Sequence, residues 1–293
     1  MIQIAKPILF SPRKEWRFAG QHLKSFLLLC DYMKRILNYP GSKWSMSDLI
    51  ISQMPEHETY VEPFFGSGAI FFNKDKSKVE TINDMDSRIV NFFEVCRDHP
   101  NQLVDKIMMT PHSRQEYYNS YKVSDDPIED ARRLMVRCWQ AIGAKTSDKT
   151  GWRSIINPNG PDTANEWATV WERIEEVAYR LKGVQIENQD ALKLLDRYNR
   201  PDVLAYVDPP YLLETRSKRL YQHEYAVADH CQLLELLSTF EGNVILSGYQ
   251  SDLYDEMLPS WNKISFGATA ESGAKRTEVL WMNYEPPGQM SLL

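Results

Sequence analysis

The clearest structural pattern in this sequence is TYVEPFFGSGAIFFNKDKSKVETIND, which spans residues 59–84. It begins with a β-prone run, Thr59–Glu62, and ends with a second one, Val79–Ile82. Between the two runs lie a turn that contains Gly66 and Gly68 and then an apolar segment typical of a helix. Two strands joined through a helix indicate a βαβ unit, and therefore an α/β protein with a parallel sheet.

Further strand-like runs occur only late in the chain, where helical segments such as Ala228–Thr239 separate them. These runs are Val184–Glu187, Val203–Val207, Val244–Ser247 and Glu278–Met282. The stretch between about residues 100 and 183 has almost no strand signal. It predicts helices at Arg114–Tyr121, Ile128–Ala141 and Glu166–Leu181, with a Gly/Pro/Asn-rich loop at Gly143–Asn165.

The predicted core is therefore split in the sequence by a mainly helical insert. We expect an N-terminal extension at residues 1–37, which includes a helix at His22–Leu37, and an α/β core formed by residues 38–99 and 184–293. Residues 100–183 form the insert.

The composition is that of an ordinary globular protein. The chain has 293 residues, of which 43% are hydrophobic and 25% charged, and this excludes a wholly disordered or collagen-like protein. The four cysteines (Cys30, Cys96, Cys138, Cys231) are far apart, so we expect buried thiols, no metal site and a cytoplasmic location. No signal peptide or membrane span is predicted. The formal charge of −6 argues weakly against a nucleic-acid partner.

The glycine turn after the first strand is a candidate nucleoside site, because glycine lets the backbone approach a ligand closely. A tight structural turn explains the same residues equally well. The dinucleotide fingerprint is incomplete, since Phe71 stands in place of its third glycine. Asp84, after the next strand, could accept hydrogen bonds from ribose hydroxyls. Alternatively Asn83, Asp84 or Asp86 simply caps the following helix.

The most informative motif is Asp208-Pro209-Pro210-Tyr211, which ends the apolar strand Val203–Val207. Two successive prolines fix the backbone and leave carbonyl groups free to accept hydrogen bonds. A carboxylate, a free carbonyl and an aromatic ring would thus converge at the carboxyl end of a sheet, where α/β proteins bind ligands. Such a corner suits a flat ring with an amino group, and a stiff turn with a buried tyrosine is the alternative.

With these motifs the sequence resembles the Dam-type (alpha-class, D12) DNA adenine-N6 methyltransferases, which use S-adenosyl-L-methionine. Glu62-Pro63-Phe64-Phe65-Gly66-Ser67-Gly68 matches the cofactor motif of that family, and Asp208-Pro209-Pro210-Tyr211 matches its catalytic tetrapeptide. The order of cofactor motif, insert and catalytic motif also agrees, over roughly residues 38–98 and 184–284. The resemblance implies a Rossmann-like core with a mixed, mostly parallel sheet and an inserted target-recognition domain.

Smaller matches extend the implied cofactor site. Tyr39-Pro40-Gly41-Ser42-Lys43 is similar to an N-terminal cofactor segment of the family, with Ser42 in place of its second glycine. By resemblance, Lys43 neutralises the methionine carboxylate, although a solvated lysine is the alternative. The family's two acidic cofactor ligands fall on Asp84 and Asp190. The implied cofactor residues are Tyr39, Lys43, Glu62, Pro63, Phe64, Gly66, Gly68, Asp84 and Asp190, whereas Phe71 and Phe72 are expected in the core.

The resemblance implies direct methyl transfer to a flipped-out adenine. Tyr211 would stack on the base, while the Asp208 carboxylate and the Pro209 carbonyl accept its two amino hydrogens. Three alternatives remain: a non-catalytic DNA-binding homologue, a cytosine-N4 methyltransferase and an RNA methyltransferase. Whether the biological role is restriction–modification, phage modification or regulation is open.

The expected macromolecular partner is double-stranded DNA, bound by a monomer or weak dimer. Candidate DNA-binding residues are Lys145, Lys149, Trp152 and Arg153 in the insert loop, and Lys218 and Arg219 after the catalytic motif. Arg132, Arg133 and Arg137 could contact DNA or form a salt-bridged helix face with Glu129 and Asp130. The insert departs from the segment that sets GATC recognition in the family, so GATC is not assumed.

Overall fold

The computed structural model describes residues 33–144, 148–157, 159–160, 162–215, 222–269 and 275–287. All of them belong to one compact unit, Met33–Leu293. Most of the predicted helix His22–Leu37 and Cys30 lie outside the described residues. The end of that helix was wrongly predicted, because residues 33–37 are not helical. Ile36 and Leu37 instead enter the core, where the Ile36 carbonyl accepts a hydrogen bond from the Trp139 indole at 2.8 Å.

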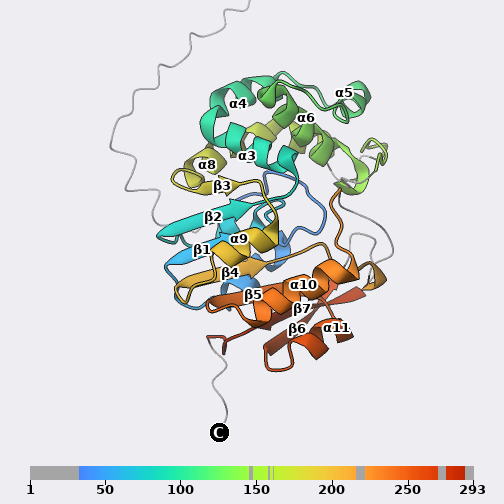
Figure 1. The fold of residues 1–293 in the computed structure, drawn as a ribbon. Coiled ribbons are helices and arrows are strands. Elements are labelled where there is room, and N and C mark those ends of the chain that lie inside the picture. Colours follow the sequence, from blue (N-terminus) through green and yellow to red (C-terminus); the bar gives the residue numbers. More distant parts are fainter. Residues whose placement is uncertain are drawn as a thin grey trace, which may run out of the picture. The chain divides into compact units, whose positions relative to one another are not determined.

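The described part contains a seven-stranded mixed sheet in the order β3-β2-β1-β4-β5-β7-β6 (Figure 1). Strands β1 to β5 pair in parallel, and β7 is antiparallel to both β5 and β6. The strands are β1 (Thr59–Glu62), β2 (Val79–Asn83), β3 (Gln185–Glu187), β4 (Val203–Val207), β5 (Asn243–Tyr249), β6 (Asn262–Thr269) and β7 (Lys275–Met282). The predicted α/β class with a mostly parallel sheet is therefore confirmed.

Helices cover both faces of this sheet. They are α1 (Ser47–Ile51), α2 (Ala69–Asn73), α3 (Ser87–Asp98), α4 (Pro100–Met108), α5 (Arg114–Asn119), α6 (Pro127–Gln140), α7 (Thr163–Thr169), α8 (Arg173–Arg180), α9 (Ala191–Arg197), α10 (Val227–Ser238) and α11 (Asp252–Met257). Strand β4 is buried throughout, and its successive side chains point to opposite faces of the sheet. Leu204 and Tyr206 belong to one hydrophobic cluster, which includes residues of α2, α3, α6 and α8, whereas Ala205 and Val207 belong to a second cluster with residues of α9 and α10.

The predicted insert, residues 100–183, is helical in the structure, and α5, α6 and the pair α7 and α8 lie where helices were expected. These helices gather beyond the β3 edge of the sheet (Figure 1). Leu134 and Met135 of α6 share one apolar cluster with Ile82 of β2. The insert thus packs continuously onto the core, and its role in target recognition remains a prediction. None of the described helices is long and apolar enough to cross a membrane.

Candidate active site

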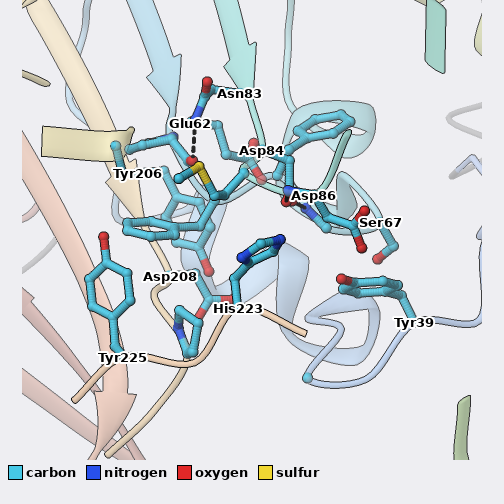
Figure 2. Close-up of a pocket in the computed structure, with 18 of the residues that line it drawn as sticks. Tyr39, Glu62, Ser67, Asn83, Asp84, Asp86, Tyr206, Asp208, His223 and Tyr225 are labelled. Atoms are coloured by element: carbon cyan, nitrogen blue, oxygen red, sulfur yellow. Dashed lines mark hydrogen bonds between the residues drawn. The ribbon is translucent and has the colours of Figure 1, made fainter. Parts of the chain in front are cut away.

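A cavity of about 450 Å³ lies where the carboxyl ends of β1, β2 and β4 meet. Connections from β1 lead outward to β2 and β3, whereas β4 lies on the other side of β1 and leads to β5. Parallel α/β sheets bind ligands at such a reversal of strand order, because the loops diverge there and leave a crevice. Figure 2 shows Tyr39, Ser67 and Asp84 on one side of this cavity and Asp208 and Tyr225 on the other.

The turn after β1 requires both of its glycines. Gly66 and Gly68 have φ values of +51° and +66°, in the left-handed region that side chains disfavour. A Cβ at Gly68 would lie 2.4 Å from the Phe65 ring, and one at Gly66 would lie 3.2 Å from the Tyr39 ring. The turn is therefore built for close approach of the backbone to aromatic rings, and Ser42 in the neighbouring segment reaches it through a 3.0 Å contact with Ser67.

Asp84 fixes this turn from the end of β2. Its carboxylate accepts hydrogen bonds from the backbone amides of Gly66 and Asp86, both at 2.9 Å. The cap of α3 is instead Asp86, which accepts from the amide of Arg88. Burial raises the pKa of Asp84 to about 7, although these amide hydrogen bonds oppose the shift. The helix-cap alternative thus applies to Asp86, and Asp84 faces the cavity.

Asp190 has two functions in the structure. It caps α9 by accepting from the backbone amides of Leu192 and Lys193, at 3.0 and 3.1 Å, and it also lines the cavity. Phe64 lines the cavity too and meets Tyr225 edge-to-face, with ring centroids 5.4 Å apart. Tyr225 has no recognisable sequence signal, because only the fold brings residue 225 beside the turn after β1.

Asp208, at the end of β4, has one carboxylate oxygen paired and one unpaired. Its Oδ2 accepts a hydrogen bond from Lys43 Nζ at 2.8 Å. Its Oδ1 is buried and has no hydrogen-bond partner among the described residues. A buried acceptor without a donor costs free energy, and in native structures ordered water, an ion or a ligand usually satisfies it.

Lys43 is buried rather than solvated, with 5% of its surface exposed. It also donates to the Gly41 carbonyl at 2.8 Å. Burial alone would lower the pKa of Lys43, but the nearby carboxylates of Asp208 and Glu278 outweigh burial and raise it. The solvated alternative was therefore wrong, because Asp208 compensates the buried charge.

Glu62 lies at the end of β1 and is also buried. Its Oε2 accepts a hydrogen bond from the Tyr60 hydroxyl at 2.7 Å. Burial raises the pKa of Glu62 to about 8, and the charge of Asp208 acts in the same direction. A protonated Glu62 limits the negative charge that collects around Asp208 at neutral pH.

Of the predicted catalytic tetrapeptide, Asp208 and Pro210 line the cavity, whereas Pro209 and Tyr211 are not among its lining residues. Every predicted cofactor residue except Gly68 lines it: Tyr39, Lys43, Glu62, Pro63, Phe64, Gly66, Asp84 and Asp190. Sequence reasoning missed several lining residues, among them Met85, Gln189, His223 and Tyr225. Phe71 and Phe72 are buried in the core as expected.

The candidate DNA-binding residues are only partly described, since Lys145, Lys218 and Arg219 lie outside the described residues. Trp152 pairs with Ala141 in an isolated bridge and packs on the His112 ring at 5.2 Å. The Lys149 ammonium lies 5.4 Å from the centre of the Tyr121 ring. The backbone of Arg153 is fixed by a 2.8 Å hydrogen bond from its amide to the Gln140 carbonyl.

The basic face of α6 is salt-bridged. Arg132 and Arg133 both pair with Glu129, at 2.7 and 2.9 Å, and Arg132 also pairs with Glu116. These pairs hold the pKa of Glu129 near 2. Arg137 is buried over the Tyr121 ring, at 4.6 Å from its centre. The salt-bridged alternative is therefore confirmed for Arg132 and Arg133 with Glu129, whereas the expected partner Asp130 pairs with Arg88 at 2.9 Å. Within the described ranges no group of three or more His, Cys, Asp or Glu residues could hold a metal ion.

Comparison with known proteins gives a consistent family match. The family model for D12 class N6 adenine-specific DNA methyltransferases matches residues 39–271. A type II methyltransferase from Lactococcus lactis subsp. cremoris, M1.LlaDCHI, is 27% identical over 284 residues, which cover 86% of this chain and 96% of that protein. DNA adenine methylases from Vibrio cholerae and Escherichia coli K12 are 25% and 26% identical over 101 and 105 residues, about a third of each chain.

Proposed function

The chain belongs to the D12 class of N6 adenine-specific DNA methyltransferases, and we propose that it methylates DNA in the cavity around Asp208 with S-adenosyl-L-methionine as methyl donor. Methylation of adenine at specific sites in DNA follows from the family and from its relatives. The observation that carries the assignment of the site is the buried, unpaired Oδ1 of Asp208.

An adenine amino group supplies what Asp208 lacks. Its two hydrogens are donors, and Oδ1 is a buried acceptor that needs one. The Pro209 carbonyl is the second acceptor in this proposal, because Pro209 and Pro210 have no amide hydrogens and hold the strand end rigid. With both hydrogens bound, the nitrogen lone pair is oriented, and Asp208 stabilises the positive charge that develops on nitrogen.

The cavity fits S-adenosyl-L-methionine in size and in chemistry. A volume of about 450 Å³ is typical of small-molecule sites. Asp84 offers carboxylate oxygens to ribose hydroxyls, the glycine turn leaves room for the backbone to approach, and Phe64 with Tyr225 offers an aromatic edge to a purine. When bound, this group supplies a methyl attached to a positively charged sulfur.

We propose that Lys43 acts on Asp208 in addition to its expected contact with the methionine carboxylate. Because its ammonium pairs with Asp208 at 2.8 Å, Lys43 orients this carboxylate beside Glu62, whose pKa burial raises to about 8. Gly41 and Asp208 use two of the three Lys43 donors, which leaves one for the methionine carboxylate.

An adenine inside a duplex cannot reach Asp208, so the base must leave the stack. We propose that the extruded base stacks on the ring of Tyr211.

The proposed DNA contacts of the insert are Lys149, Trp152 and Arg153, together with Lys145. Lys218 and Arg219, after the catalytic motif, are further proposed contacts. The Lactococcus relative is named as a type II methyltransferase, and we propose that this chain likewise acts in the cytoplasm on one short sequence.

Genomic DNA from a methylation-free host tests the function. The purified protein is incubated with this DNA and S-adenosyl-L-methionine, and the DNA is then sequenced by a method that detects modified bases. We expect N6-methyladenine in a single short motif. N4-methylcytosine would overturn the assignment of the base, and unmodified DNA would favour a non-catalytic DNA-binding homologue.

A further inference from the structure

Strand β7 carries a buried carboxylate that the mechanism above does not use. Glu278 is 7% exposed, and the next residues along the strand, Val279 and Leu280, are fully buried. Removing a carboxylate from water is costly unless hydrogen bonds or opposite charges compensate. Burial raises the pKa of Glu278, although Lys43 and a hydrogen bond from Tyr211 oppose the shift. Groups in contact with Glu278 must therefore compensate for the burial of its carboxylate.

The main contact of Glu278 is with the tyrosine of the catalytic tetrapeptide. The Tyr211 hydroxyl donates to Glu278 Oε2 at 2.7 Å and lies 3.0 Å from Ser247 Oγ. Because the phenol has a single hydrogen, Ser247 is the donor in the second contact. The Tyr249 ring meets Tyr211 edge-to-face at 4.6 Å. Two strands thus fix the Tyr211 ring at its hydroxyl and along its edge.

Sheet register makes this arrangement rigid. Glu278 of β7 lies opposite Tyr249 of β5 in the antiparallel ladder. Ser247 precedes Tyr249 by two residues on β5, so both side chains lie on the same face of the sheet. The acceptor for the phenol is therefore held by backbone pairing between two strands and not by a flexible loop.

The same tyrosine also touches the cation that pairs with Asp208. Lys43 Nζ lies 4.8 Å from the centre of the Tyr211 ring and 2.8 Å from Asp208 Oδ2. A ring held by Glu278 thus defines one wall of the space around Lys43 and Asp208. Any rotation of Tyr211 would disturb both the stacking surface and the lysine above it.

We infer that Glu278 is a positioning residue for methyl transfer, which holds the Tyr211 hydroxyl and so sets the plane of the ring on which the target adenine stacks. The inference rests on the proposed function, since it assigns the stacking role to Tyr211. Misplacement of a reactant by about 1 Å can cost on the order of 100-fold in rate. Loss of the Glu278 acceptor should therefore reduce kcat more than it weakens binding of the methyl donor.

Two variants separate the position of the hydrogen-bond acceptor from its charge. Glu278→Gln keeps an acceptor oxygen at the same side-chain length but removes the charge, whereas Glu278→Asp keeps the charge on a side chain one methylene shorter. We expect Glu278→Asp and Glu278→Leu to lower kcat about 10- to 100-fold, and Glu278→Gln to stay within about threefold of the wild type. Methyl incorporation into unmethylated genomic DNA gives kcat, and calorimetry gives the affinity for S-adenosyl-L-methionine, which should change less than about twofold.

A double-mutant cycle shows whether Glu278 acts through Tyr211. Tyr211→Phe removes the hydroxyl, so Glu278→Asp should add no further loss of kcat in that background. Glu80→Gln is the matched control. Glu80 lies on β2, and its buried carboxylate pairs with Lys74 and Arg180. Neutralising it should lower Tm without changing kcat.

Three results would overturn the inference: wild-type kcat in Glu278→Asp, a large loss in Glu278→Gln with none in Glu278→Asp, or additive losses in the double mutant. Failure of the proposed function looks different. In that case Asp208→Ala would retain full turnover, whatever the Glu278 variants do.

Discussion

At Asp208 and Lys43, two charged side chains are buried side by side at the carboxyl end of the sheet. Each one makes burial of the other tolerable, since the 2.8 Å ion pair compensates part of the cost of leaving water. The pair leaves one Asp208 oxygen available for a substrate donor. At the scale of single residues, we therefore expect stability and the proposed catalysis to depend on the same contact.

Removal of the lysine tests this contact. We expect Lys43→Met to lower the free energy of unfolding by about 3 kcal/mol, because it leaves Asp208 buried without its partner. The double variant Lys43→Met/Asp208→Asn should recover more than half of that loss. Urea unfolding curves measure both. A Lys43→Met variant within about 0.5 kcal/mol of the wild type would show that the ion pair contributes nothing to folding.

The raised pKa of Glu62 predicts a pH dependence of stability. The unfolded chain loses the Glu62 proton near the ordinary glutamate pKa of 4.5, whereas the folded protein keeps it up to about pH 8. The unfolded state thus binds fewer protons in this window, and stability falls as pH rises through it, by at most about 1.4 kcal/mol per pH unit from this group. Glu62→Gln should flatten the fall in Tm between about pH 5 and pH 8. An unchanged slope would mean that Glu62 is ionised in the folded protein.

At the scale of elements, the turn between β1 and α2 shows most clearly how the sequence determines the site. Gly66 and Gly68 adopt left-handed conformations that bring the backbone against Tyr39 and Phe65, while Asp84 of the neighbouring strand holds the turn through the Gly66 amide. The turn was predictable from sequence because glycine spacing after a strand has few structural explanations. Its partner Tyr225 was not predictable, since that contact depends on tertiary structure alone.

An alanine at Gly68 tests the turn. Its Cβ would lie 2.4 Å from the Phe65 ring at a φ of +66°, so we expect a loss of about 2 kcal/mol or more in the free energy of unfolding. Gly267→Ala is the control, because a Cβ at Gly267 of β6 would meet nothing within 4 Å. Thermal unfolding of the two variants should differ clearly, and equal Tm values would contradict the strained geometry of the turn.

Most elements of the core could be predicted, and the exceptions have physical reasons. Strand β4 is apolar throughout, which is typical of a central strand buried on both faces. Strand β6 was missed because it lies at the edge of the sheet and alternates Ile264 and Phe266 with exposed Lys263 and Ser265, a weaker signal. The end of the helix expected at His22–Leu37 was wrong: residues 33–37 are not helical, and Ile36 and Leu37 pack against distant residues.

For the whole molecule, the net charge of −6 had argued against a DNA partner, yet the family match overrules that argument. The structure removes Arg132 and Arg133 from the candidate phosphate contacts, because ion pairs with Glu129 and Glu116 neutralise them within the insert. Basic residues that remain outside such pairs can still meet phosphates. The sequence identifies both groups of basic residues, but only the fold shows which of them form ion pairs.

Salt dependence of DNA binding tests this division. Lys149→Ala and Arg153→Ala should each reduce the slope of log K against log salt by about 0.9, the contribution of one neutralised phosphate. Arg133→Gln should leave the slope unchanged, since Arg133 pairs with Glu129 at 2.9 Å. Fluorescence anisotropy with labelled duplex DNA at several salt concentrations measures the slopes. A smaller slope in Arg133→Gln than in Lys149→Ala would reverse the assignment.

The most direct measurement compares the wild type with Asp208→Ala. Unmethylated DNA is incubated with each protein and S-adenosyl-L-methionine, the DNA is digested to nucleosides, and mass spectrometry counts the methylated ones. We expect N6-methyl-2′-deoxyadenosine from the wild type. Asp208→Ala should yield at least about 100-fold less of it, with binding of the methyl donor largely retained. Near-normal methylation by Asp208→Ala would contradict the central claim that this carboxylate binds and orients the adenine amino group.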